Sequence, residues 1–253
     1  MSEPGERPTA IVTGGARGIG RGCALKLAEA GCAVALVDVL VPEMARTKGE
    51  IEALGVPCLT FEADVADHGA AKEVAEAVLA DWGRIDILVN NAGRSMPKGI
   101  LEVSEAEWDA TINVNLKSCF NYVQAVAPAM LAAERGRIVS MSSLNAHSGG
   151  VTAAVSRFAY AAAKAGILGM TRALAKELGP HVQVNAVCPG LIKTEITKNA
   201  VIAERESELI EGIALHRVGA PRDVAELVGF LALSEPCFIT GQAITIDGFQ
   251  WNM

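Results

Sequence analysis

Aromatic residues are scarce in this chain of 253 residues, where Phe, Trp and Tyr together make up 4% of the sequence. Hydrophobic residues nevertheless account for 51%, so the interior has to be built mainly from Ala, Val, Leu and Ile. Such an aliphatic interior is the usual filling of a parallel β-sheet that is buried on both faces. The length suits one large α/β domain and is short for two, so we expect residues 1–253 to form a single domain.

The chain also lacks long apolar runs and any excess of positive charge. No uninterrupted apolar run reaches the roughly 18 residues that a membrane-spanning helix needs, and the polar start MSEPGERP lacks the apolar region of a signal peptide. The formal net charge is −7 with both signs spread along the chain, so there is no basic stripe to neutralise nucleic-acid phosphates. We therefore expect a cytoplasmic protein that binds neither nucleic acid nor membranes.

The cysteines and histidines form no recognisable metal-binding or disulfide pattern. No Cys-x-x-Cys pair occurs, and the four histidines are isolated from one another. With a large core available, we expect buried free thiols in a reducing compartment and no metal site. The six cysteines lie in apolar segments at Cys23, Cys32, Cys58, Cys119, Cys188 and Cys237.

Short apolar runs alternate with helical stretches along the whole chain. A typical helix is expected over Ala71–Trp82, where Val74 and Val78 recur at helical spacing while Lys72 and Glu76 point elsewhere. Repeated strand–helix alternation predicts an α/β fold with a doubly wound parallel sheet, whose ligands bind at the carboxyl ends of the strands. The expected strands are TAIVT from Thr9, AVALVD from Ala33, PCLTFE from Pro57, DILVNN from Asp86, RIVSMS from Arg137, VQVNAV from Val182 and QAITID from Gln242.

A glycine-rich turn follows the first expected strand, in the run TGGARGIG from Thr13 to Gly20. Glycines allow the backbone to turn tightly and to approach a pyrophosphate, which the N–H groups and dipole of the following helix attract. The spacing G-x-x-x-G-x-G differs from the G-x-G-x-x-G of most dinucleotide-binding folds. A purely structural strand-to-helix turn is therefore the alternative.

An acidic residue, Asp38, ends the second expected strand eighteen residues after Gly20. Dinucleotide-binding folds place an acid here to hydrogen-bond the adenosine ribose, and a carboxylate repels a 2′-phosphate. Asp38 therefore favours NAD over NADP. Arg17 in the glycine turn leaves the reverse preference open, because a guanidinium suits a phosphate. A solvated acid at a strand end is the plain alternative for Asp38.

Tyr160 and Lys164 lie four residues apart in an Ala-rich helical segment, so their side chains share one face of the helix. A nearby ammonium stabilises a phenolate, which makes a tyrosine usable as an acid or base. The preceding strand delivers Ser142 and Ser143 at its carboxyl end, the edge from which the glycine turn also emerges. Three polar elements are thus expected on one rim of the sheet.

From Thr9 to Gly248 the sequence resembles the short-chain dehydrogenase/reductase family. The resemblance implies a Rossmann fold with a seven-stranded sheet, usually in a homotetramer. It is carried, in order along the chain, by TGGARGIG from Thr13, Asp64-Val65, Asn90-Asn91-Ala92-Gly93, Asn115, Ser143, Tyr160, Lys164, Pro189-Gly190 and Thr194.

The resemblance also implies a role for each matched residue. Tyr160 exchanges a proton with the substrate oxygen, Ser143 hydrogen-bonds the same oxygen, and Lys164 tunes Tyr160 and holds the nicotinamide ribose. Asn115 supports a water chain to Lys164. The plain alternatives are a helix-interior polar residue for Asn115, a turn residue for Ser143 and a helix N-cap for Thr194. The implied cofactor-binding residues are Gly14, Arg17, Gly18, Ile19, Gly20, Asp38, Asp64, Val65, Asn91, Ala92, Gly93, Tyr160, Lys164, Pro189, Gly190, Ile192 and Thr194.

The segment between Ser143 and Tyr160 is longer than the family usually has, so it places extra residues beside the expected substrate site. Four polar residues are candidates for the lining of the substrate pocket, with a solvated surface as the alternative for each. They are Arg94, Asn145, His147 and Arg157.

Two features near the C-terminus complete the expectations. The polar stretch over 194–216 is a candidate substrate lid. Phe249 stands where many relatives have Gly, and we expect Phe249 and Trp251 to pack in the core, at a subunit contact or near a neighbouring pocket.

These residues predict reversible hydride transfer between NAD and a secondary alcohol or ketone. The polar candidates favour a small polar substrate such as a sugar, a polyol or a hydroxy acid. One alternative is an NADPH-dependent reductase of 3-oxoacyl thioesters, against which Asp38 argues. Another is a catalytically silent dinucleotide-sensing protein, which intact Ser143, Tyr160 and Lys164 disfavour.

Overall fold

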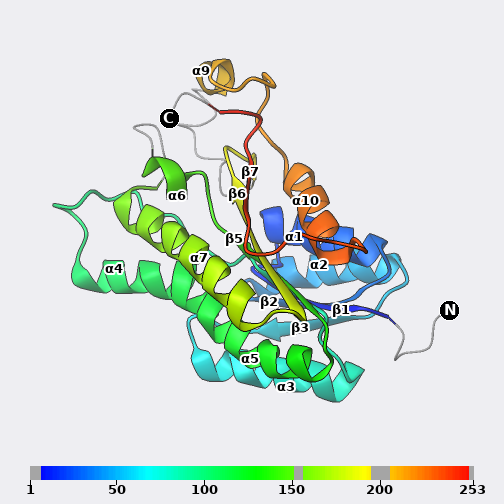
Figure 1. The fold of residues 1–253 in the computed structure, drawn as a ribbon. Helices are drawn as coiled ribbons and strands as arrows, with labels where there is room; N and C mark the ends of the chain where they lie inside the picture. The colour runs from blue at the N-terminus through cyan, green and yellow to red at the C-terminus, as the bar shows by residue number, and fades with distance from the viewer. Residues whose placement is uncertain (1–6, 151–155, 195–205, 251–253) are drawn as a thin grey trace.

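Figure 1 shows a parallel β-sheet covered on both faces by helices. The computed structural model describes residues 7–150, 156–194 and 206–250. Within these residues the sheet has seven strands in the order β3-β2-β1-β4-β5-β6-β7, and the expected doubly wound α/β fold is confirmed. The strands are β1 (Thr9–Thr13), β2 (Ala33–Asp38), β3 (Cys58–Glu62), β4 (Ile87–Asn90), β5 (Gly136–Met141), β6 (Val182–Pro189) and β7 (Ala243–Ile246).

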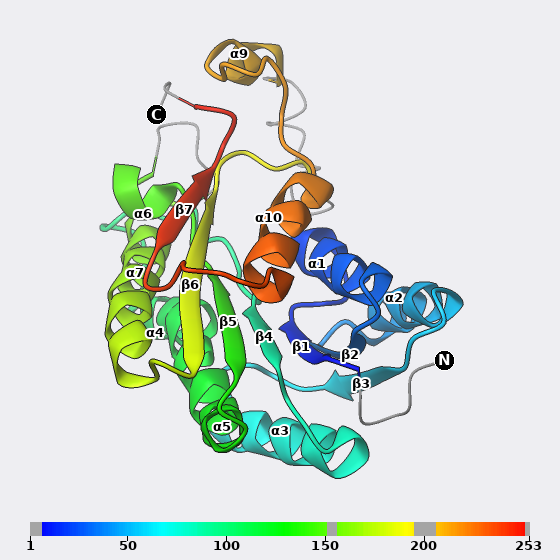
Figure 2. The same ribbon diagram turned by 45° about the vertical axis from the view of Figure 1, so that its right-hand side comes forward.

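The helices form one layer on each face of the sheet (Figure 2). Aliphatic side chains from both layers pack against the strands, and Val12, Leu36 and Val89 are completely buried between them. One layer holds α1 (Gly18–Glu29), α2 (Val41–Ala53) and α10 (Pro221–Leu233), and the other holds α3 (His68–Trp82), α4 (Glu105–Ile112), α5 (Ser118–Ala132) and α7 (Phe158–Glu177). Shorter elements are the π-helix η1 (Asn113–Lys117), α6 (Asn145–Ser148) and α9 (Glu206–Glu211).

Most of the expected strands shift by one residue at an end, and two larger differences, at α3 and β6, have local reasons. Helix α3 begins at His68, before the apolar periodicity starts, because the Asp67 carboxylate accepts hydrogen bonds from the N–H groups of Gly69 and Ala70 at 2.7 and 3.1 Å. Strand β6 continues to Pro189 because its last residues still pair with β7, where Pro189 lies opposite Ile246. Capping and pairing extend elements where hydrophobic periodicity gives no signal.

The cysteines are all free, and Cys237, in the connection between α10 and β7, is only half-buried rather than buried as expected. Burial raises the pKa of Cys23 to about 12 and that of Cys32 to about 11, so both thiols stay protonated near neutral pH. Across the described residues, no three side chains of the metal-binding types come together to hold an ion.

The order of the strands reverses between β1 and β4, and this position determines where a ligand can bind. Strands β2 and β3 lie beyond β1, while β5, β6 and β7 lie beyond β4. Loops leaving neighbouring strands in opposite directions leave a crevice between them at the carboxyl edge of the sheet. In the part of the chain that the structure describes, no helix is long and apolar enough to cross a lipid bilayer.

Candidate functional site

The glycine turn runs from β1 into α1 with a backbone that side chains would strain. Gly14 and Gly18 have φ angles of +63° and +56°, in the left-handed region that glycine adopts without cost. Helix α1 begins at Gly18, and Arg17 at its N-cap position makes no side-chain capping bond to the first turn. The N–H groups of that turn are therefore suited to an anion such as a pyrophosphate.

The glycine turn is interlocked with the loop that follows β4. The Nδ2 of Asn91 donates to the carbonyl oxygens of Thr13 and Gly14, both at 3.0 Å, and the Oγ1 of Thr13 accepts from the N–H of Asn91 at 3.0 Å. A Cβ atom at Gly20 would lie 2.0 Å from the Gly14 oxygen and 2.4 Å from the Asn91 Nδ2. Helix α1 therefore lies too close to the glycine turn and to Asn91 for a side chain, so only glycine fits at position 20.

Asp38 lies beside the glycine turn at the end of β2. Its Oδ2 accepts from the N–H of Ala16 at 3.0 Å and its Oδ1 from the N–H of Leu40 at 3.1 Å, so the carboxylate is bound rather than simply solvated. Arg17 is half-buried on the same turn. The loop after β3 carries Asp64, which is exposed, and Val65, which is buried. These residues lie on the β2 and β3 side of the crevice, where the adenosine end of a dinucleotide would bind.

On the other side of the crevice, the end of β5 is fastened to α7 at Lys164. The Nζ of Lys164 donates to the carbonyl oxygen of Met141 at 2.7 Å, and the Ser142 hydroxyl donates to the carbonyl oxygen of Lys164 at 2.8 Å. Lys164 is only 3% exposed, and its Nζ lies 5.5 Å from the centroid of the Tyr160 ring. The structure thus brings Tyr160, Lys164 and the strand that leads to Ser143 together.

Ser143 begins the turn after β5, and its Oγ accepts from the N–H of Asn145 at 3.2 Å. Because a hydroxyl can accept and donate at once, this contact leaves the Ser143 proton available for a substrate oxygen. The turn continues beside the end of β6, where the N–H of Leu144 donates to the Pro189 oxygen at 2.9 Å. Ser143 is half-buried at this edge of the sheet.

Asn115 is completely buried in the π-helix η1. Its Nδ2 donates to the carbonyl oxygens of Arg94 and Thr111 at 3.0 and 2.9 Å, and its Oδ1 accepts from the N–H of Arg94 at 3.1 Å. A Cβ at Gly93 would lie 2.8 Å from the Asn115 Oδ1 and 3.4 Å from the Lys164 Nζ, which places both groups around Gly93. π-Helical turns are rare in proteins, and those that occur often lie at functional sites.

The remaining residues of the expected cofactor site follow β6. Gly190 donates its N–H to the Ile246 oxygen at 3.0 Å, and Ile192 forms an isolated parallel bridge with Gly219. Thr194 is half-buried. Residues 195–205 of the expected lid lie outside the described residues, as does Trp251. Within the described part of that lid, α9 stands above the carboxyl ends of the strands in Figure 2.

The four candidate substrate residues differ in their surroundings. Arg94, His147 and Arg157 are exposed, while Asn145 is half-buried and its Nδ2 donates to the Ser156 oxygen at 3.4 Å. The exposure of Arg94, His147 and Arg157 fits a solvated surface as well as an open pocket.

Sequence reasoning missed Ser156, where the long segment after Ser143 joins α7. The buried Ser156 Oγ accepts from the N–H of Met96 at 3.3 Å, and the N–H of Arg157 donates to the Met96 oxygen at 2.8 Å. These bonds attach the segment to the loop after β4. A lone serine in a long loop carries no sequence signal that would have identified it.

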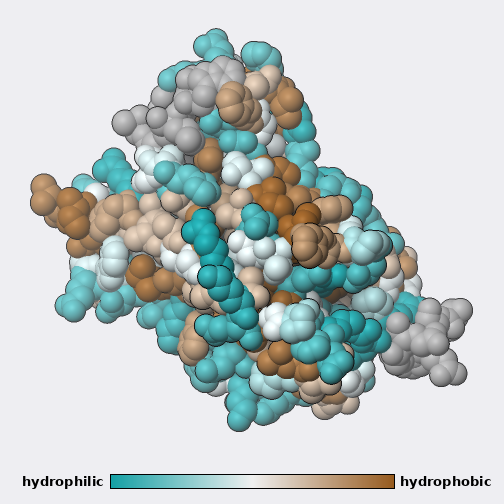
Figure 3. All heavy atoms as spheres, in the orientation of Figure 1, coloured by the Kyte–Doolittle hydropathy of each residue, from teal (hydrophilic) through white to brown (hydrophobic). Residues whose placement is uncertain are grey.

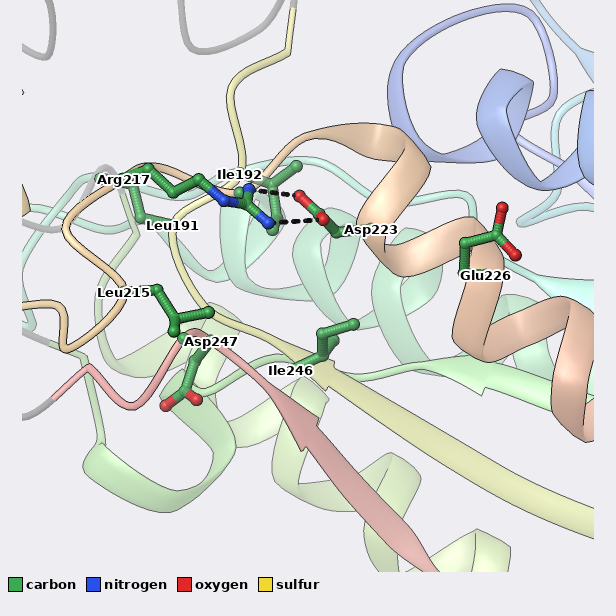
Figure 4. A pocket seen from close by; sticks show the side chains of 10 residues that line it. Leu191, Ile192, Leu215, Arg217, Asp223, Glu226, Ile246 and Asp247 are labelled. Atoms are coloured by element: carbon green, nitrogen blue, oxygen red, sulfur yellow. Dashed lines mark hydrogen bonds and ion pairs between the residues drawn. The ribbon is translucent and has the colours of Figure 1, made fainter.

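A hollow of about 260 Å³ opens beside the expected site, at the ends of β6 and β7 (Figure 4). Arg217 and Asp223 form a two-bond ion pair on its wall, with both N···O distances 2.7 Å. This pairing holds the pKa of Asp223 down at about 2. Of the residues expected to bind the cofactor, Ile192 lines the hollow, and neither Tyr160 nor Ser143 does.

Known proteins match this chain over nearly its whole length. A family model described as enoyl-(acyl carrier protein) reductase matches residues 14–248. A 3-oxoacyl-[acyl-carrier-protein] reductase of Thermotoga maritima is 40% identical over 244 residues, which cover 96% of this chain and 97% of the relative.

Two solved structures from Brucella melitensis share the fold. A 3-oxoacyl-[acyl-carrier protein] reductase with bound NAD is 33% identical at a TM-score of 0.86, covering 99% of this chain and 93% of its own. A short-chain dehydrogenase/reductase described as glucose/ribitol dehydrogenase is 30% identical at a TM-score of 0.87, covering 99% of both chains.

The crowding at Gly20 yields a binding test. We expect Gly20→Ala to raise the dissociation constant of NADH at least about tenfold, because the new methyl group must displace the glycine turn or Asn91. Fluorescence titration of the purified protein measures this constant. The matched control is Gly49→Ala, whose Cβ enters open space on α2. The control is expected to bind NADH like the wild type and to gain about 0.5 to 1 kcal/mol of stability. Equal binding by both variants would contradict the assignment of the turn.

Proposed function

The chain belongs to the short-chain dehydrogenase/reductase family and is an oxidoreductase of that type, and on this premise we propose that it reduces the keto group of a 3-oxoacyl thioester with NADH. The observation that supports the reaction class is the arrangement of Tyr160, Lys164 and Ser143 at the carboxyl end of β5. The substrate class rests on the 40% identity to the Thermotoga maritima reductase. A small polar substrate, favoured from the sequence, has weaker support from the comparisons.

The residues present fit a nicotinamide dinucleotide. Gly14, Gly18 and Gly20 give a turn without side chains that suits a pyrophosphate, and we assign Asp38 to the adenosine ribose and Lys164 to the nicotinamide ribose. When bound, the reduced nicotinamide supplies the hydride for the keto carbon.

Proton transfer is assigned to the chain's own residues. The Tyr160 hydroxyl donates its proton to the keto oxygen, so that a secondary alcohol forms, and the Ser143 hydroxyl hydrogen-bonds the same oxygen. The Lys164 ammonium, held by the Met141 oxygen, stabilises the phenolate that Tyr160 leaves behind. Asn115, anchored to the backbone of Arg94, fixes the loop beside Lys164. Reoxidation of the alcohol uses the same groups in reverse.

NAD rather than NADP is the proposed cofactor. The Asp38 carboxylate is bound by the N–H groups of Ala16 and Leu40, and this orientation keeps a negative charge beside the ribose position. A 2′-phosphate there would meet like charge. The Brucella melitensis protein that was solved with bound NAD is also described as a 3-oxoacyl reductase, so a similar protein combines that description with NAD.

A polyol or sugar dehydrogenase is the second candidate, supported by the structural likeness to the protein described as glucose/ribitol dehydrogenase. The two candidates are separated by assaying the purified protein with acetoacetyl-coenzyme A and NADH, and with polyols and NAD. A kcat/KM higher for the polyols would reverse the order of the candidates. No turnover of either class would favour a dinucleotide-sensing protein.

We expect Tyr160→Phe to lower kcat on the better substrate by about 10²-fold to 10⁴-fold, the loss typical of removing a general acid. NADH binding should remain within about twofold of the wild type, because the ring is kept. Steady-state kinetics and fluorescence titration provide the two readouts. A variant that retains more than about a tenth of the wild-type kcat would remove Tyr160 from the proton-transfer role.

Asp38→Ser is expected to weaken NADH binding and to reduce the preference for NADH over NADPH, since both the ribose contact and the repulsion are lost. Glu62→Ser is the matched control. Glu62 lies opposite Asp38 on β3, and its replacement removes one negative charge, as the replacement of Asp38 does. The ratio of the two dissociation constants is the measurement. A wild-type preference for NADPH, or equal ratios in the two variants, would exclude the role of Asp38.

We also propose a homo-oligomer, a tetramer as the resemblance implies, that assembles through the β7 edge of the sheet. Strand β7 is an edge strand, and Phe230, Phe238 and Phe249 are exposed on α10 and beside β7. Hydrophobic side chains gather over α10 in Figure 3. Phe249 is 72% exposed, and its main chain is held at φ +59° by hydrogen bonds with Asp247 and Ala214. Contact with a second copy of the chain would bury these three rings and so account for their exposure in the single chain.

For this assembly we expect Phe238→Asp to lower the mass measured by size-exclusion chromatography with light scattering. Phe238 is fully exposed in the single chain, so the fold should tolerate the charge. The control Leu101→Asp places the same charge on an equally exposed residue in the loop before α4, and it should keep the wild-type mass. A monomeric wild type, or an unchanged mass for Phe238→Asp, would contradict the proposed interface.

A further inference from the structure

Ala16 lies in the middle of the glycine turn, and both of its main-chain polar groups are hydrogen-bonded to side chains of other elements. Its N–H donates to the Asp38 Oδ2 at 3.0 Å, and its carbonyl oxygen accepts from the Thr47 Oγ1 at 2.9 Å. Asp38 ends β2 and Thr47 lies in α2, so two different elements hold one peptide segment of the turn. A third bond, from the N–H of Gly14 to the Val37 oxygen at 2.8 Å, holds the start of the turn.

Thr47 differs from the other buried helical threonines and serines that the structure describes. A hydroxyl inside a helix commonly bonds back to the carbonyl one turn earlier. Thr111, Ser118 and Thr171 all do so, at 2.6, 2.6 and 2.8 Å. Thr47 is completely buried and instead donates to a residue 31 positions away in the chain. A buried hydroxyl directed out of its helix at the cofactor turn calls for a role there.

The contacts of Ala16 connect Thr47 to Asp38. Ala16 is itself buried, so its carbonyl oxygen has no ready access to water as a replacement partner. If the Thr47 bond were lost, the peptide segment would be free to shift, and the N–H that orients the Asp38 Oδ2 would shift with it. The position of the carboxylate relative to the ribose therefore depends on a hydroxyl in α2.

We propose that Thr47 is a positioning residue that sets the preference for NAD over NADP by holding Ala16, and through Ala16 the Asp38 carboxylate. The inference rests on the proposed use of NAD at this turn. Thr47 itself touches neither the proposed cofactor position nor the reacting atoms. Its effect should thus appear in cofactor affinity and selectivity and not in the proton transfer by Tyr160.

The test uses Thr47→Val, which keeps the volume and the branching and removes only the hydroxyl. The dissociation constant of NADH is expected to rise about tenfold, while that of NADPH changes by less, so the selectivity ratio falls. Thr47→Ser restores the hydroxyl and should return both constants to within about twofold of the wild type. Fluorescence titration with NADH and NADPH needs no substrate, so the result is independent of the substrate assignment.

The matched control is Thr171→Val, because Thr171 is also buried in a helix but bonds to its own helix at the Ile167 oxygen. Its melting temperature should fall about as much as that of Thr47→Val, with cofactor constants unchanged. Equal selectivity ratios in Thr47→Val and Thr171→Val, or failure of Thr47→Ser to rescue, would overturn the proposal.

A failure of the variants to fold and a failure of the wild type to bind cofactor have different meanings. If Thr47→Val does not fold, Thr47→Ala repeats the measurement without the added methyl group, and a failure of both to fold would assign Thr47 to stability alone and overturn the proposal. A wild type that binds neither NADH nor NADPH would instead refute the proposed function on which the inference rests.

Discussion

The hydroxyl of Thr13 holds together the two halves of the sheet at the point where the strand order reverses. It accepts from the N–H groups of Asn91 and Ala92 at 3.0 and 3.1 Å and donates toward the Val89 oxygen at 3.4 Å. The loops after β1 and β4 would otherwise leave in opposite directions with unpaired polar groups. Joining them fixes the glycine turn against the loop that leads to Asn115, and so fixes one half of the crevice relative to the other.

The half of the crevice beyond β4 depends on a buried cation. Burying an ammonium is costly unless it is hydrogen-bonded. The Lys164 ammonium donates to the carbonyl oxygen of Met141, which is the last residue of β5. The same contact brings the start of the Ser143 turn to α7. The neighbouring thiols do not compensate the charge, because burial raises the pKa of Cys188 above its usual value although Lys164 acts in the opposite direction. Lys164 therefore stays a buried cation beside Tyr160, as its proposed role requires.

In the half beyond β1, the glycine turn and Asp38 are held by hydrogen bonds between side chains and the main chain. Asp38 uses one oxygen for the glycine turn and the other for Leu40, and Thr47 supports the same turn from α2. A carboxylate held in this way keeps its direction without a cationic partner that would cancel its charge. Selectivity for a ribose over a phosphate can then come from a single acid, provided that its supporting turn does not move.

The sequence alone determined the elements whose signals are local. Apolar runs located each of the strands that the structure describes, because burial of a parallel sheet requires an apolar run in each strand separately. Glycine spacing located the turn. The spacing of four residues between Tyr160 and Lys164 placed both side chains on one helix face, because helical periodicity is also a local property of the sequence. Tertiary structure decided which distant groups meet: the Asn115 amide with the backbone of Arg94, Ser156 with Met96, and Thr47 with Ala16. Periodicity carries no information about such partners, because a hydrogen bond between residues far apart in the chain depends on the path of the backbone between them.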